Sequence, residues 1–288
     1  LVVTSNQPHR PWNRGDASAY DPETLTLPPY LGDTAATRLA MTQYYAEITY
    51  MDNQFGQVQA SLETTGEADH TLVVFLSEQG SNFPHCKWTC YDTGLRSAQI
   101  VGWPEVVTPG STTDAMVQYV DILPTFIEAA GGDPTNFNFD GRSFLGVLKG
   151  DTEKHRDYAF GIQTSRGIYN GPEAYGIRTV RDQRYRLIWN LNASSDFRNS
   201  VVAKFGVYTS WATGDAHAKA QHERYRKRPE FELYDLTKDP FEMANLAANP
   251  EYKTTIDGLR QQLDNWMTAQ GDKGAETEAA AHQRIKKR

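Results

Sequence analysis

The chain has 288 residues, of which 39% are hydrophobic and 11% aromatic, so it can bury a sizeable core in one large domain or two smaller ones. Its formal net charge of -7 leaves no dominant basic face for phosphates, which argues against a nucleic-acid-binding protein. No apolar run is long enough to span a bilayer, and no signal peptide opens the chain.

The first residues, Leu1-Val-Val-Thr4, have the pattern of the end of a strand, and no Met precedes them, so we expect further natural sequence upstream. Prolines exclude a helix in the next stretch, and His9 lies there, just past the strand end. On local evidence alone, the simplest interpretation of His9 is a solvated loop residue.

The clearest helix is predicted to begin at Asp33-Thr34 and to stop at Gly66. Apolar residues recur along it at spacings of three or four, which is typical of a helix face packed in a core. These residues are Leu39, Tyr45, Ile48, Met51, Phe55, Val58 and Leu62.

An unbroken apolar run over residues 72–76 predicts a short strand buried on both faces, which is typical of parallel sheets. Glu78, Gln79 and Gly80 follow it directly, and Lys87 lies on the next loop. Ligands in open α/β sheets bind just beyond the carboxyl ends of strands. These residues are therefore candidates for a functional site.

The chemistry of these side chains favours an anion site with a cation beside it. Glu78 and Gln79 offer the hard oxygen donors that calcium or magnesium accepts. Lys87 offers a point charge for an anionic oxygen, and His9 offers a second donor or a proton for a leaving group. Together they would suit hydrolysis of a sulfate or phosphate group.

The two cysteines, Cys86 and Cys90, lie four apart, which matches neither a zinc knuckle nor a redox pair. Free thiols and a local disulfide both remain open.

Beyond this loop, a strand is expected at 97–103 and a helix at 115–131 that begins or kinks near Pro124. A short helix is expected at 144–148. The composition becomes polar and charged near residue 150, which predicts a domain boundary, with a first domain at 1–150 and a second at 151–270. Residues 271–288 are polar with little to bury, so we expect a frayed helix or tail.

The second domain has the signals of an antiparallel sheet. Short segments with alternating apolar and polar residues lie at 158–161, 176–180, 185–189 and 231–234. A helix follows, marked by Ile256, Leu259, Leu263 and Trp266. Between these elements, residues 198–228 contain seven Lys and Arg residues with aromatic residues among them, either as a solvated insertion or as the rim of an anion site.

The chain resembles the later part of a sulfatase of the alkaline-phosphatase superfamily, and it is most similar to the heparan N-sulfatases. The order and spacing of the similar segments over most of the chain make chance similarity implausible. They are Pro8-His-Arg-Pro11, 19–22 with Pro28, 71–80 with Phe83-Pro84, 120–125, Asp140-Gly-Arg-Ser143, 177–180, 186–192, and 232–240 with Glu242 and 245–247.

The resemblance implies an α/β fold, an alkaline-phosphatase-like sandwich with a mainly parallel central sheet and a smaller C-terminal α+β subdomain with an antiparallel sheet. It places Glu78 and Gln79 at calcium-ligand positions, each one methylene longer than the usual Asp-Asn or Asp-His pair. It places Lys87 at the basic position that contacts the sulfate. His9 matches the histidine that contacts the sulfate or the leaving group, which replaces the local interpretation.

Four further residues fall in the segment that borders the sugar site in the family, although no motif fixes their roles: Arg166, Tyr169, Glu173 and Arg178.

Two family features are absent from residues 1–288. No Cys/Ser-x-Pro-x-Arg motif encodes a formylglycine nucleophile, and no adjacent Asp pair supplies further calcium ligands. Both lie upstream in the family. We therefore expect that this chain is the later part of the enzyme and that alone it binds parts of the metal and sulfate without turnover.

The resemblance implies a sulfatase that acts on a sulfate ester or N-sulfate of a sugar, with heparan-type N-sulfoglucosamine as the foremost substrate. The alternatives are a phosphohydrolase of the same superfamily, with a Ser or Thr nucleophile, and a non-catalytic glycan-binding protein. The implied partner is a sulfated saccharide, and a homodimer is also possible. Neither nucleic acid nor a membrane is expected as a partner. The implied location is periplasmic, secreted or lysosomal.

Overall fold

The computed structural model describes residues 1–164, 175–199, 202 and 205–280. Before residue 150 its helices and strands are η1 (Ala17–Ala19), α1 (Ala35–Thr65), η2 (Ala68–His70), β1 (Val73–Leu76), α2 (Asp92–Leu95), β2 (Gln99–Gly102), η3 (Tyr119–Asp121), α3 (Ile122–Ala129), η4 (Pro134–Asn136) and α4 (Leu145–Leu148). After it they are β3 (Ala159–Gln163), β4 (Ile177–Arg181), β5 (Tyr185–Asn190), α6 (Gly206–Trp211), α7 (Ala216–Arg226), β6 (Phe231–Asp235), η5 (Pro250–Tyr252), α8 (Lys253–Ala269) and α9 (Ala275–Ala280). Every helix in these ranges is too short or too polar to cross a membrane.

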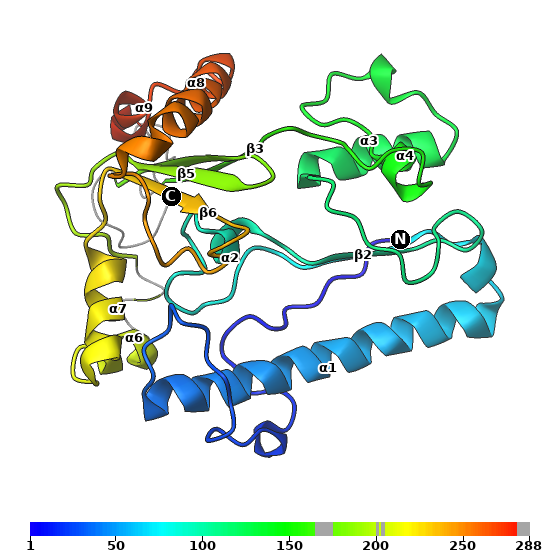
Figure 1. The fold of residues 1–288 in the computed structure, drawn as a ribbon. Helices are drawn as coiled ribbons and strands as arrows, with labels where there is room; N and C mark the ends of the chain where they lie inside the picture. Colours follow the sequence, from blue (N-terminus) through cyan, green and yellow to red (C-terminus); the bar gives the residue numbers. More distant parts are fainter. Residues whose placement is uncertain (165–174, 200–201, 203–204, 281–288) are drawn as a thin grey trace.

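The strands form two sheets, β1-β2 and β3-β4-β5-β6 (Figure 1). The long helix α1 runs along one side of the molecule, and α8 lies on one face of the four-stranded sheet. The two sheets fall on either side of the boundary predicted near residue 150.

Helix α1 begins and ends where the sequence predicts. The Thr34 hydroxyl accepts a hydrogen bond from the Thr37 amide, and Gly66 ends the helix with a φ of 75°. The predicted apolar face is only half-buried, however, and Leu39 is 57% exposed. The buried residues lie in the first half of α1, because that half packs against α6 and the Trp12 loop.

The strand predicted at 72–76 forms as β1, but its pairing corrects the prediction. It pairs with β2 in antiparallel register, with Val73 opposite Gly102 and Leu76 opposite Gln99. An apolar run cannot reveal the direction of its partner, and the chain returns here through a loop without the helical crossover that parallel neighbours need. All pairs among the described strands are antiparallel, so the expected parallel central sheet is not present within them.

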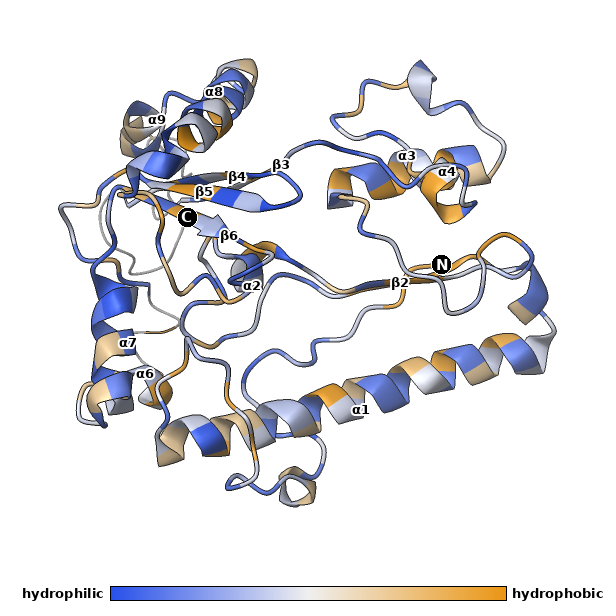
Figure 2. Cartoon of the chain, in the orientation of Figure 1, coloured by the Kyte–Doolittle hydropathy of each residue, from blue (hydrophilic) through white to orange (hydrophobic). Residues whose placement is uncertain are grey.

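The first sheet also leaves apolar surface open. All four residues of β1 are half-buried, which differs from the predicted burial on both faces. Ile100 of β2 is 63% exposed, and Leu123 and Phe126 of α3 are 54% and 41% exposed. Figure 2 shows this apolar character along β2 and on α3.

The C-terminal sheet confirms the predicted antiparallel strands and the helix after them. Its two faces pack differently, because successive residues of a strand point to opposite sides. Leu187 of β5 packs in the core beneath α8 with Leu259 and Leu263, whereas Ile188 packs on the other face with Tyr91. The loop between β1 and β2 thus covers the face opposite α8.

The basic segment at 198–228 is largely structural where it is described. Trp211 of α6 is 1% exposed, and its indole nitrogen donates a 2.9 Å hydrogen bond to the Thr37 hydroxyl of α1. Tyr225 of α7 is 5% exposed. Two of its aromatic residues are therefore core residues, and neither forms the rim of an open site.

Of the frayed helix or tail expected over residues 271–288, the described part contains a helix. Helix α9 forms, and Glu278 on it is 2% exposed because it pairs with Arg178 of β4. Sequence patterns missed this because the helix is held by a buried charge and not by an apolar stripe. Residues 281–288 lie outside the described residues.

Candidate functional site

The candidate site begins where β1 ends. The amide of Ser77 donates to the carbonyl of Ala98 at 3.0 Å, and the Ser77 hydroxyl accepts from the Ala98 amide at 2.8 Å. Glu78 and Gln79 follow at once. A Cβ atom on Gly80 would lie 1.9 Å from the Thr93 carbonyl oxygen, so only glycine allows the two segments to approach this closely.

The loop that carries Lys87 is tied together by its own hydrogen bonds. The Lys87 amide donates to the Ser81 carbonyl at 2.9 Å, and the hydroxyls of Thr89 and Thr93 donate to the His85 carbonyl at 2.8 and 3.0 Å. These bonds fix the backbone around Lys87.

A buried histidine packs at the centre of this loop. The His85 ring stacks between Tyr30 and Tyr91, with centroid distances of 4.7 and 3.8 Å. Burial, with the nearby Arg224 and Arg228, holds the pKa of His85 well below its usual value. His85 is therefore a neutral packing residue at physiological pH and not a proton carrier.

Three of the predicted site residues meet through hydrogen bonds. In the amide orientation that satisfies both neighbours, Gln79 donates to Glu78 Oε1 at 2.7 Å and accepts from Lys87 Nζ at 3.1 Å. Glu78 is exposed, whereas Lys87 is only 8% exposed. The structure thus places Glu78, Gln79 and Lys87 together beyond the strand end.

The charge of Lys87 has no counter-ion within the described part of the chain. Its ammonium contacts the neutral amide of Gln79, and no described carboxylate pairs with it. A buried charge without a partner is costly, so such a group favours an anionic ligand. This is the strongest electrostatic feature of the site.

His9 lies on a separate, exposed loop. Its Nδ1 is 2.6 Å from the Arg10 carbonyl oxygen. A carbonyl can only accept, so Nδ1 carries the hydrogen, and Nε2 is the atom free to gain or lose a proton. No hydrogen bond among the described residues joins His9 to Glu78, Gln79 or Lys87.

Aromatic packing joins the His9 loop to the Lys87 loop. The Trp12 indole donates to the Pro8 carbonyl at 2.9 Å, and the Trp12 ring stacks on Phe83 at a centroid distance of 5.1 Å. Phe205 packs against both rings. Sequence patterns do not reveal this bridge, because Trp12 and Phe83 are far apart along the chain.

Arg178, predicted near a sugar site, lies inside the C-terminal subdomain. It is 2% exposed, and its guanidinium pairs with Asp272 and, at 2.9 Å, with Glu278. This placement occupies its donors with protein carboxylates. The other three residues predicted there, Arg166, Tyr169 and Glu173, lie outside the described residues.

The two cysteines are buried free thiols, which settles the alternative that the sequence left open. Burial raises the pKa of Cys90 to about 12 and raises that of Cys86 as well. Neither thiol is a nucleophile at neutral pH.

The donors at the strand end fit calcium in type. Glu78 and Gln79 supply carboxylate and amide oxygens, but calcium takes about six to eight oxygen ligands. Within the described ranges, no group of three or more His, Cys, Asp or Glu side chains could hold a metal ion. Glu78 and Gln79 therefore offer oxygen donors of a suitable type, but fewer of them than calcium takes.

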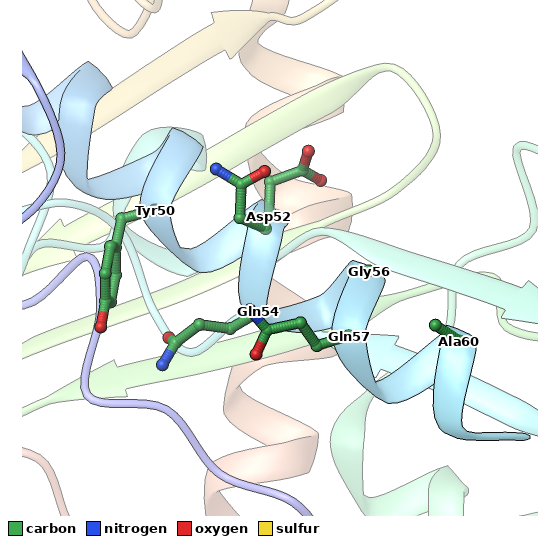
Figure 3. Close-up of a pocket in the computed structure, with 7 residues that line it drawn as sticks. Tyr50, Asp52, Gln54, Gly56, Gln57 and Ala60 are labelled. Atoms are coloured by element: carbon green, nitrogen blue, oxygen red, sulfur yellow. The ribbon is translucent and has the colours of Figure 1, made fainter.

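A hollow of about 750 Å³ lies elsewhere, along the second half of α1. Figure 3 shows Tyr50, Gln54 and Gln57 among its lining side chains. None of the predicted site residues lines it, so it is separate from the strand-end site.

Comparisons with known proteins bear on this arrangement. The family model described as Sulfatase matches residues 1–132, and the model described as N-sulphoglucosamine sulphohydrolase, C-terminal, matches residues 84–198. An ulvan-active sulfatase of Formosa agariphila is 37% identical over 229 residues, covering 80% of this chain and 43% of the relative. Human N-sulphoglucosamine sulphohydrolase is 29% identical over 274 residues, covering 86% and 52%.

Solved structures support the fold. One, described as a complex with its substrate D-glucosamine-2-N,6-O-disulfate, matches with a TM-score of 0.63 and 24% identity, covering 84% of this chain and 43% of that one. The architecture is thus the α/β fold of the alkaline-phosphatase-like class, as the sequence predicts, although the described strands pair only in antiparallel fashion. Within that class, the chain is similar to members of the sulfatase family over residues 1–198. It spans about half the length of the curated relatives it matches.

Proposed function

We propose that the full-length protein is a sulfatase that hydrolyses a sulfate ester or N-sulfate on a sugar. The observation that carries this proposal is that Lys87 is only 8% exposed and that its ammonium meets Gln79 but no described carboxylate. A sulfate oxygen would supply the missing negative charge. The family match over this segment supports sulfate over other anions.

In the proposed mechanism, Lys87 binds a sulfate oxygen and steadies the charge that develops there. The Nδ1 hydrogen of His9 is held by the Arg10 carbonyl, so His9 acts after its Nε2 has taken a proton from solvent. The imidazolium then donates this Nε2 proton to the leaving oxygen or nitrogen as its bond to sulfur breaks, and the ring returns to its neutral form. Glu78 and Gln79 would hold a calcium ion, which when bound withdraws charge from the sulfate. We propose a formylglycine nucleophile, which residues 1–288 do not encode.

Two substrate classes have specific support. The C-terminal family model and the human relative favour N-sulfoglucosamine of the heparan type. The higher identity to an ulvan-active sulfatase, 37% against 29%, favours ulvan. We place N-sulfoglucosamine first because a family model for that enzyme class matches the chain. Because members of the family are mostly found there, we also propose a periplasmic, secreted or lysosomal location. The oligomeric state that we propose to test alongside is a homodimer.

The test is sulfate release by the full-length protein from N-sulfoglucosamine, a sulfated ulvan oligosaccharide and a phosphate monoester, each with calcium and with a chelator. We expect release from one of the sulfated sugars and its loss with the chelator. Turnover of the phosphate monoester alone would favour a phosphohydrolase. Saccharide binding without turnover of any compound would favour the non-catalytic glycan-binding alternative.

A further inference from the structure

A buried group of charges lies between the Lys87 loop and the C-terminal sheet, and we call Asp92, Arg181, Arg186 and Glu242 the anchor cluster. Asp92 begins α2, five residues after Lys87. Its Oδ1 pairs with Arg186 at 2.6 Å and with Arg181 at 3.0 Å. Both arginines belong to the C-terminal sheet region, so they hold the loop from outside it.

Glu242 completes the anchor cluster from a third segment of the chain. It is 0% exposed, and its Oε2 accepts a 2.6 Å hydrogen bond from the Asp92 amide. Its Oε1 lies 3.0 Å from Arg186 Nε. Arg186 thus bridges two acidic side chains, and it also donates to the Cys90 carbonyl at 3.3 Å.

Contacts between the two arms of the loop link the position of Asp92 to that of Lys87. The Gly80 amide, next to Gln79, donates to the Gly94 carbonyl at 3.3 Å. A Cβ atom on Gly94 would lie 2.6 Å from the Cys86 and Thr89 carbonyl oxygens, so the two arms of the loop are in close contact. Shifting α2 would therefore move both the Gln79 turn and the Lys87 backbone.

We propose that the anchor cluster positions the sulfate-binding ammonium, so that the C-terminal subdomain fixes where Lys87 lies. Asp92 and Arg186 are then positioning residues and do not touch the substrate. The role of Lys87 in binding sulfate rests on the proposed function. The positioning itself does not, because the place of the Lys87 amine can be measured without turnover.

The test compares Asp92→Asn and Arg186→Lys with the wild type in the full-length protein. Asp92→Asn leaves two guanidinium groups without the carboxylate between them. Arg186→Lys keeps the positive charge but removes the planar fork that bridges Asp92 and Glu242, so it serves if the first variant does not fold. Asp235→Asn is the matched control, since Asp235 is 2% exposed and pairs with Arg184 at 2.7 Å, away from the loop.

The readout is the rate at which acetic anhydride labels the Lys87 amine in sulfate-free buffer, followed by mass spectrometry. We expect labelling to rise about tenfold in Asp92→Asn and Arg186→Lys, as local opening of the loop exposes the amine, and to stay near the wild-type rate in Asp235→Asn. Circular dichroism confirms that each variant is folded.

Unchanged labelling in folded Asp92→Asn or Arg186→Lys would overturn the proposal, as would an equal rise in Asp235→Asn. Adding inorganic sulfate distinguishes the positioning of Lys87 by the anchor cluster from the binding of sulfate by Lys87. If sulfate slows the labelling of Lys87 in the wild type, and does so less in the two variants, both the positioning and the sulfate site are supported. If labelling rises as expected but sulfate protects no form of the protein, the positioning stands and the proposed sulfate site fails.

Discussion

Glu242 offers a pH-dependent test of how the anchor cluster is built. Burial raises the pKa of this carboxyl from 4.5 to about 7, although Arg186 and the Asp92 amide both favour the ionised form. The folded protein therefore holds the proton more tightly than the unfolded chain does. The stabilisation from Glu242 is complete below about pH 4.5 and is lost as the pH rises through about 7.

The size of the effect follows from the two pKa values. The difference between 4.5 and about 7, at about 1.4 kcal/mol for each pKa unit, amounts to about 3 kcal/mol of unfolding free energy. Glu242→Gln keeps an oxygen for the Asp92 amide but cannot ionise. We expect this variant to match the wild type near pH 4 and to be about 3 kcal/mol more stable near pH 8.

Urea denaturation of both proteins across this pH range measures the difference. Glu153→Gln is the control, because Glu153 is exposed, and its curve should follow the wild type. A Glu242→Gln variant whose stability relative to the wild type is the same at both pH values would refute the reasoning. So would a Glu242→Gln variant whose stability falls relative to the wild type as the pH rises.

Three further predictions concern packing. In a double-mutant cycle of Trp12→Leu and Phe83→Leu, we expect a coupling of about 0.5 to 1.5 kcal/mol from the stacked rings, and additive effects on stability would count against the bridge between the loops. Arg178→Met should cost about 3 to 5 kcal/mol and remove hydrogen-exchange protection from α9, whereas unchanged protection would contradict the pairing. Trp211→Phe should cost about 1 kcal/mol by removing the hydrogen bond to Thr37, and an unchanged urea midpoint would show that bond to be unimportant.

The sequence predicted those parts of the fold in which local pattern decides the outcome. The alternation of apolar and polar residues identified the four C-terminal strands, because one face of each strand packs beneath α8. A cap residue and a glycine located both ends of α1. The direction of β1 was not predictable, since an apolar run of five residues is compatible with either kind of neighbour.

The candidate site was predictable for a different reason. Glu78, Gln79 and Lys87 lie within one short loop, so their meeting depends mainly on local chain geometry. Arg178 shows the limit of such reasoning. Its partners lie about a hundred residues away, and only the fold reveals that its charge is used inside the subdomain.

The anchor cluster was missed for the same reason, because Asp92 meets its partners only across the folded chain. In sequence, Asp92 and Glu242 are single acidic residues in loops, where a solvated side chain is the default expectation. Their burial, and not their identity, distinguishes them.

The most direct test of the central claim is the effect of Lys87→Met on sulfate release by the full-length protein. Lys154→Met, at an exposed position, is the control. If Lys87 binds the sulfate, its loss should lower kcat/KM by about a hundredfold or more, while Lys154→Met keeps the wild-type value. Wild-type kcat/KM in the folded Lys87→Met protein would contradict the account.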